Sequence, residues 1–148
     1  MRLTSPRIAP LQNAEMDAEQ QEIVAPMGER VINIFRTMVQ APKAAKGFLA
    51  WGNYVLSKKN DLPAREREIV ILRIGFLCKS GYEWTQHVPI GVRAGLTEDE
   101  VARIKGGADA PGWSPSDQAL LRASDELHHG QFITDATWAA LKAHFSDK

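Results

Sequence analysis

The sequence has little of what would place it in several common protein classes. It has a single cysteine, Cys78, among 148 residues, which excludes an intrachain disulfide and a cysteine-rich zinc site. Its longest apolar runs, at 69–72 and 74–78, are separated by Arg73, whereas a membrane-spanning helix needs about 18 apolar residues. Residues 1–7 lack the apolar stretch of a signal peptide. These absences predict a cytoplasmic protein that has no contact with a membrane.

An excess of charge of one sign is also missing. Lysine and arginine together number 18, and aspartate and glutamate also number 18, so the formal net charge is zero. Non-specific binding to nucleic acid or to an anionic membrane surface needs a positive field, so we expect neither partner. A zero net charge gives little repulsion between copies of the chain, which is compatible with a homo-oligomer.

What is present is a series of helix patterns, and no alternating strand pattern accompanies them. Residues 1–14 contain two prolines and predict an extended arm, followed by a single domain over 15–148. We expect seven to eight helices in that domain, and the predicted fold class is all-α. The expected helices cover 17–25, 31–40, a segment from Pro42, 63–79, 82–94, and segments that begin near Thr97, Ser114 and Thr134.

Several of these helices carry recognisable end signals. Pro63 suits a first helical turn, Gly95 suits a left-handed C-cap, and Thr97 with Glu100 forms a capping-box pattern. The helix over 63–79 is apolar nearly all round beyond its charged first turn, with the exception of Arg73. Because such a helix has no polar face, we expect it to be central and buried.

The helix over 82–94 has the most unusual pattern. Glu83 and His87 share one face with small and apolar residues, where a solvent-facing stripe would be more charged. A buried carboxylate and imidazole with shifted pKa values are what proton transfer near neutral pH requires. The alternative is an ordinary surface pair one helical turn apart, and Glu68 alone is equally compatible with a surface acid in a first turn.

Two segments resemble the carboxymuconolactone decarboxylase family, which shares its helical fold with alkylhydroperoxidase D. They are Leu62–Arg73 and Tyr82–His87, and shorter similarities follow at 94–97 and 123–127. The resemblance covers roughly residues 30–145 and implies an alkylhydroperoxidase D-like helical bundle. Since members of the family assemble as dimers, trimers or hexamers, it also implies a homo-oligomer.

The alkylhydroperoxidase branch of this resemblance uses a Cys-x-x-Cys pair that precedes a histidine. Aligned on His87, the two cysteine positions hold Ser80 and Glu83. A disulfide-cycling peroxidase needs an attacking thiolate and a resolving thiol, so we reject the two-cysteine mechanism. Cys78 aligns with neither position, and we expect it to be a buried small apolar residue, with a one-cysteine peroxide function as the alternative.

The decarboxylase branch has a glutamate at the position of Glu83 and keeps the histidine. The resemblance therefore implies a cofactor-independent carbon–carbon lyase, a decarboxylase of a lactone or keto acid, or a related proton-transfer enzyme, in aromatic-compound catabolism. It implies His87 as the acid/base group, Glu68 as the residue that orients it, and Glu83 as a second acid/base group. No metal or organic cofactor is implied, and the partner would be a small organic acid or lactone. The candidate substrate-binding residues are Trp84, Tyr82, Trp51 and Ser80.

Other interpretations stay open. A non-catalytic small-ligand binder or scaffold on the same fold is the alternative function, and a peroxide-linked redox protein, with family-level peroxiredoxin activity, is the third. Arg73 is the nearest basic candidate to bind a substrate carboxylate. Asp125 and His129 lie one turn apart, but two ligands are too few for a closed metal site. A pocket lined by the three acid/base residues would favour the enzyme.

Overall fold

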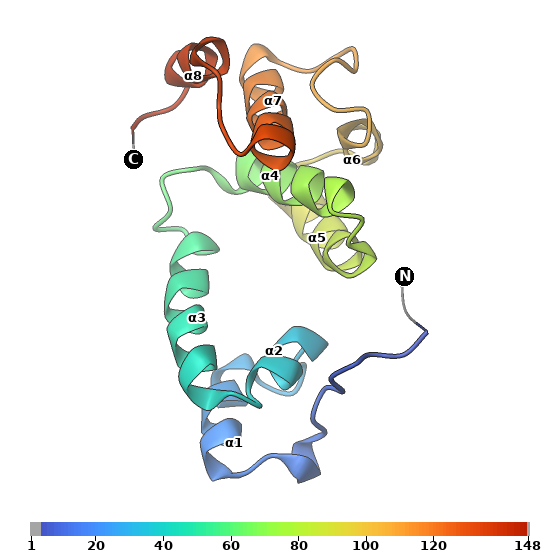
Figure 1. Ribbon diagram of the computed structural model, residues 1–148, viewed down its shortest axis with the longest axis vertical. Coiled ribbons are helices and arrows are strands. Elements are labelled where there is room, and N and C mark those ends of the chain that lie inside the picture. Colours follow the sequence, from blue (N-terminus) through green and yellow to red (C-terminus); the bar gives the residue numbers. More distant parts are fainter. Residues whose placement is uncertain (1–3, 148) are drawn as a thin grey trace. The chain divides into compact units, whose positions relative to one another are not determined.

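The chain is all-helical over residues 4–147, which are the residues that the computed structural model describes (Figure 1). The predicted fold class, all-α with seven to eight helices, is confirmed. The α-helices are α1 (Ala18–Val24), α2 (Asn33–Met38), α3 (Pro42–Val55), α4 (Ala64–Leu77), α5 (Gly81–Ala94), α6 (Glu98–Ile104), α7 (Pro115–Gly130) and α8 (Asp135–Lys142), and two 3-10 helices lie at Asn13–Glu15 and Ala25–Met27.

The described residues divide into two compact units. One extends to Asn60 and contains α1, α2 and α3, and the other begins at Asp61 and contains α4 to α8. The first 3-10 helix begins at Asn13, inside the predicted arm. Residues 1–3 of that arm and residue 148 lie outside the described residues. A single domain over 15–148 stays a prediction.

The first unit has its own small apolar core. It is formed by Met16, Ile23, Val24, Val39 and Ala45. The chain segment that precedes this core is hydrogen-bonded to α2, because the Arg36 guanidinium donates to the backbone carbonyl of Leu11 over 3.0 Å. The predicted arm therefore packs against the first unit through this contact.

The second unit is built around α4. This helix contacts α5, α6 and α7, and α8 packs on α7 (Figure 1). The core on which they meet is made of Ile69, Leu72, Leu96, Val101, Ile104, Ala108, Trp113 and Leu121. The apolar pattern of α4 correctly predicted its central position, since a helix without a polar face needs neighbours on several sides.

Two arginines of α4 join it to its neighbours. At its first turn, the Arg65 guanidinium donates to Asp117 of α7 over 2.9 Å and to Glu100 of α6 over 2.5 Å. The hydrogen bonds to the Asp117 and Glu100 carboxylates raise the pKa of the Arg65 guanidinium above its usual value. These contacts fix the first turn of α4 against two helices.

Arg73, the second arginine, is 8% exposed. Its Nε donates to Asp125 Oδ1 over 2.6 Å, and its Nη1 donates to the backbone carbonyls of Ile104 and Lys105 over 2.9 Å each. The suggestion that Arg73 binds a substrate carboxylate is therefore wrong. Its Nε and Nη1 donate inside the fold, where the Nη1 also satisfies carbonyls at the end of α6.

Two of the predicted helix-end signals are confirmed, whereas Pro63 is the N-cap before α4 rather than a residue of its first turn. Thr97 and Glu100 exchange capping-box hydrogen bonds at the start of α6, and Gly95 adopts a left-handed φ of 111° after α5. Over residues 4–147, no helix combines the length and apolar character that a membrane span requires.

Candidate functional site

The candidate site lies where α5 packs closely against α4. A Cβ atom added at Gly91 of α5 would lie 2.9 Å from a Leu96 methyl carbon and 3.5 Å from the Glu68 Cβ. A Cβ added at Gly75 of α4 would lie 3.5 Å from the Glu83 Cβ. The absence of side chains at both glycines lets the two helices approach, which brings Glu68 next to the face of α5 that carries Glu83 and His87.

Glu68 and His87 form a hydrogen-bonded pair across this contact. The Glu68 Oε2 lies 2.8 Å from the His87 Nδ1. The glutamate is fully buried, at 0% exposure, and the histidine side chain is 13% exposed. Because an ionised carboxylate only accepts hydrogen bonds, the proton of this bond belongs to Nδ1. The Nε2 is therefore the ring nitrogen of His87 that can gain or lose a proton.

Glu83 lies on the other side of the imidazole ring. Its Oε2 is 3.4 Å from the His87 Nε2, one helical turn along α5, and its side chain is 39% exposed. The imidazole thus lies between a buried carboxylate and a carboxylate that reaches solvent. The helical spacing predicted the second contact, whereas the first joins residues that are 19 positions apart.

The electrostatic surroundings favour the charged form of the imidazole. The hydrogen bond to Glu68 raises the pKa of His87 above its usual value, and the negative charges of Glu68 and Glu83 add to that effect. Burial and the positive charge of Arg67 act in the opposite direction. Among the described residues the buried Glu68 Oε1 has no hydrogen-bond partner, and the Arg67 Nε lies 3.8 Å from it.

A comparison with protein-family models gives one match for this chain. The model described as the carboxymuconolactone decarboxylase family matches residues 42–126, which are more than half of the sequence. The chain belongs to this family. The match contains Glu68, Glu83 and His87 and extends from α3 into α7. Neither the curated proteins nor the solved structures contain a significant match.

Two of the predicted substrate-binding residues of this carboxymuconolactone decarboxylase family member line one hollow. It has a volume of about 370 Å³ and lies between the end of α4, the start of α5 and the residue after α6. Trp84 and Ser80 line it. The other lining residues are Gly75, Phe76, Lys79, Gly81 and Lys105.

The other two predicted substrate-binding residues are not among those lining this hollow. Tyr82 is 36% exposed near the start of α5. Trp51 belongs to α3 in the first unit, where it is 66% exposed and its ring centroid lies 5.8 Å from that of Tyr54. Of the four predicted substrate-binding residues, Trp84 and Ser80 are therefore the two that line this hollow.

The two lysines of the hollow were missed by sequence reasoning. Lys79 directly precedes Ser80, so its position beside a predicted site residue was a usable signal. Lys105 follows α6 and is 21 positions from Trp84 in the sequence, and only its ammonium group 5.0 Å from the Trp84 ring centroid reveals the proximity. No local pattern could have indicated that contact.

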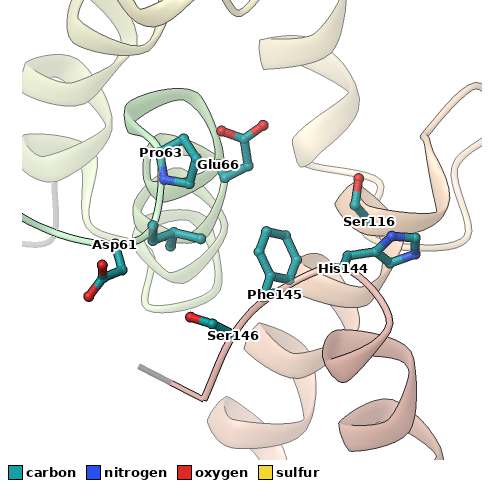
Figure 2. A pocket seen from close by; sticks show the side chains of 8 residues that line it. Asp61, Pro63, Glu66, Ser116, His144, Phe145 and Ser146 are labelled. Atoms are coloured by element: carbon teal, nitrogen blue, oxygen red, sulfur yellow. The ribbon is translucent and has the colours of Figure 1, made fainter.

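A second hollow of about 360 Å³ lies at the start of α4 and contains none of the predicted site residues. Figure 2 shows its side chains, with the Phe145 ring near the middle. Its lining residues are Asp61, Leu62, Pro63, Glu66, Ser116, His144, Phe145 and Ser146.

The environment of Cys78 differs from the prediction. This cysteine caps the C-terminal end of α4 and is exposed, so the expectation of a buried apolar residue is wrong. Gly75 is the last buried residue of α4, and Phe76 in the next position is already 40% exposed.

The pair Asp125 and His129 serves local structure in this family member. The Asp125 carboxylate accepts from Arg73, and its backbone carbonyl lies 2.8 Å from the His129 Nδ1. Within the described part of the chain, no three histidine, cysteine, aspartate or glutamate side chains gather in a way that could hold a metal ion.

Proposed function

We propose that this protein is a cofactor-independent carbon–carbon lyase that decarboxylates a lactone or keto acid in the breakdown of aromatic compounds, with His87 as its acid/base group. The observation that carries the proposal is the imidazole between two carboxylates, one buried and one in reach of solvent. Membership of the carboxymuconolactone decarboxylase family supports it.

The proposed reaction needs an electron sink, which the substrate provides. The bond to the carboxylate carbon breaks, carbon dioxide leaves, and the electron pair of that bond enters the conjugated carbonyl to form a dienolate. The His87 imidazolium then donates its Nε2 proton to the carbon that is to be protonated, which balances the departure of carbon dioxide. A proton from solvent restores the imidazolium. The protein's part is to position the acid and to stabilise the developing charge.

The two glutamates have different parts in this proposal. Glu68 holds the His87 Nδ1 proton and fixes the ring orientation over 2.8 Å, as carboxylates commonly do for catalytic imidazoles. Glu83 faces the Nε2 and reaches solvent, so it is placed to relay the returning proton. Both carboxylates raise the pKa of the His87 imidazole, which favours the protonated state that a general acid requires.

The test is release of carbon dioxide from a panel of unsaturated lactone acids and keto acids. His87→Gln is expected to lower turnover of an accepted substrate by about 100-fold or more, the usual contribution of a general acid, with unchanged helical circular dichroism. His144→Gln, at an exposed histidine of the same unit, is the matched control and should keep full turnover. Absence of carbon dioxide release from every acid of the panel, or full activity of His87→Gln, would contradict the proposal.

The third function, a peroxide-linked redox protein, has the exposure of Cys78 in its favour. We expect Cys78→Ser to consume peroxide at the same rate as the unchanged protein. A loss of peroxide consumption in this variant would favour the redox function over the lyase.

We propose further that the protein is a cytoplasmic homo-oligomer. The zero net charge supports self-association, and so do the exposed aromatic side chains Phe48, Trp51 and Tyr54 of α3. Sedimentation equilibrium tests this directly, and a monomer at all concentrations would contradict it.

A further inference from the structure

The hollow at the start of α5 combines positive charge with aromatic walls. Lys79 and Lys105 line it together with Phe76 and Trp84, and no acidic residue is among its lining residues. Neither lysine pairs with a carboxylate among the residues the structure describes. We infer that this hollow is a binding site for a planar organic carboxylate, with the two lysines as the anion-binding groups.

The aromatic rings give the hollow its preference for a flat ligand. The Trp84 and Phe76 ring centroids lie 6.2 Å apart at an interplanar angle of 61°. The Lys105 ammonium group lies 5.0 Å from the Trp84 ring centroid, a cation–π distance. This contact places a positive charge at the rim of an apolar wall. A planar unsaturated acid can therefore contact the wall with its body and the ammonium group with its carboxylate.

Lys79 occupies a backbone position that normally belongs to glycine. It has a φ of 54°, directly after the end of α4. Its N–H donates to the Phe76 carbonyl, and the Ser80 N–H donates to the Gly75 carbonyl, each over 2.9 Å. This is the Schellman arrangement, in which the left-handed residue is usually glycine. A lysine there costs conformational energy that a glycine would not, and such a residue is commonly kept for function.

The start of α5 adds to the positive field. Ser80 caps this 14-residue helix by accepting from the Glu83 N–H, and Gly81 is its first residue. The N-terminal end of a helix carries partial positive charge. An anion in the hollow therefore faces the two ammonium groups and the favourable end of the helix dipole.

The hollow adjoins the acid/base residues through α4. Gly75 lines it, and a Cβ at Gly75 would lie 3.5 Å from the Glu83 Cβ and 3.9 Å from the Trp84 backbone nitrogen. That the bound carboxylate is the substrate of the reaction rests on the proposed function. The binding itself does not, because it needs only the charges and rings of the hollow.

The first experiment measures binding of trans-cinnamate, a planar carboxylate, to the full chain by isothermal titration calorimetry and by NMR. We expect saturable binding that weakens as salt is added, with shifts of the Gly75 and Gly81 amide signals and of the Trp84 indole signal. The neutral isostere trans-cinnamamide should bind at least about fivefold more weakly, which corresponds to about 1 kcal/mol for an exposed charge pair. Equal affinity for the amide, or shifts confined to other residues, would overturn the inference.

The second experiment changes the lysines. Lys105→Gln is expected to weaken cinnamate binding about fivefold or more, whereas Arg93→Gln, an exposed cation at the other end of α5, should leave it unchanged. Lys79→Gly should weaken binding to a similar extent and yet raise the melting temperature by about 3 °C, since glycine suits the left-handed backbone. Unchanged binding in both lysine variants would overturn the inference.

A third variant separates the binding site from the proposed reaction. His87→Gln should bind cinnamate with unchanged affinity, because the histidine is not among the residues that line the hollow. Cinnamate binding without release of carbon dioxide from any acid would contradict the proposed lyase function and support the binding site. Release of carbon dioxide without cinnamate binding would contradict the binding site and support the lyase function.

Discussion

At the scale of single residues, the pKa of His87 links its environment to stability. Its hydrogen bond to Glu68 raises this pKa above the ordinary histidine value, which is about 6.5. A group whose pKa is raised on folding stabilises the folded state fully below its unfolded pKa. That contribution is lost as the pH rises through the folded pKa. The imidazole therefore stabilises the fold most under mildly acidic conditions.

Removal of the Glu83 charge should lower the pKa of His87. In Glu83→Gln the imidazole loses a negative charge whose Oε2 lies 3.4 Å from its Nε2, while the stronger effect of Glu68 remains. The titration of the His87 ring proton, followed by NMR, should move to lower pH without returning to that of an unfolded histidine. The signal of His144 in the same sample serves as the control. A titration at unchanged or higher pH would contradict the geometry.

Replacement of the buried carboxylate should affect stability and titration together. Glu68→Gln keeps the side-chain shape but removes the charge that faces the His87 Nδ1. We expect a loss of about 1–3 kcal/mol in the free energy of unfolding near pH 6, the usual contribution of a hydrogen bond to a charged group. The loss should diminish as the pH rises, because the imidazole becomes neutral in the unchanged protein as well.

Urea denaturation at several pH values measures this difference. Glu98→Gln, at an exposed acid of the α6 first turn, is the matched control and should stay within about 0.5 kcal/mol of the unchanged protein. If Glu68→Gln lowered the free energy of unfolding by the same amount at all pH values, the Glu68–His87 pair would stabilise the fold through packing alone.

At the scale of helices, the α4–α5 contact depends on Gly91. An alanine there would place its Cβ 2.9 Å from a Leu96 methyl carbon and 3.4 Å from a Leu72 methyl carbon. Overpacking of this kind costs about 1–3 kcal/mol, so Gly91→Ala should unfold at lower urea concentration. Because Glu68 lies at the same contact, the His87 titration should also move toward lower pH.

A glycine in open space provides the control for that substitution. Gly130 is the last residue of α7, and a Cβ there meets no atom within 4 Å. Gly130→Ala should therefore be neutral or slightly stabilising, by up to about 1 kcal/mol. If the two alanine variants behaved alike, the close approach of α4 and α5 would not be what Gly91 provides.

The helices show which structural features a local sequence pattern can predict and which it cannot. The caps at Thr97 and Gly95 were predictable because each signal lies within a few residues of the end it marks. The role of Arg73 was not, because its partner Asp125 lies 52 positions away. The same limit hid Lys105, whereas Glu83 and His87 fall on one helix face at a spacing that a single helix dictates. The partnership of Glu68 and His87 came from the family resemblance rather than from spacing.

At the scale of the whole molecule, the region that matches the family does not coincide with either of the two units of the chain. The match begins with α3, in the first unit, and ends in α7, in the second. The carboxylate pair around His87, the Arg73 contacts and the core around Ile69 all lie within the second unit. The described contacts that position the acid/base group are therefore made by residues after Asn60.

A fragment that begins at Asp61 tests that separation. It contains a core of its own and the arginine contacts that join α4 to α6 and α7, so we expect it to fold with helical circular dichroism. Its His87 should titrate above the ordinary histidine pKa of about 6.5, because both carboxylates are present. The fragment carrying His87→Gln identifies that signal by its disappearance. An unfolded fragment would instead favour the single domain over 15–148, since the site would then need the first unit in order to form.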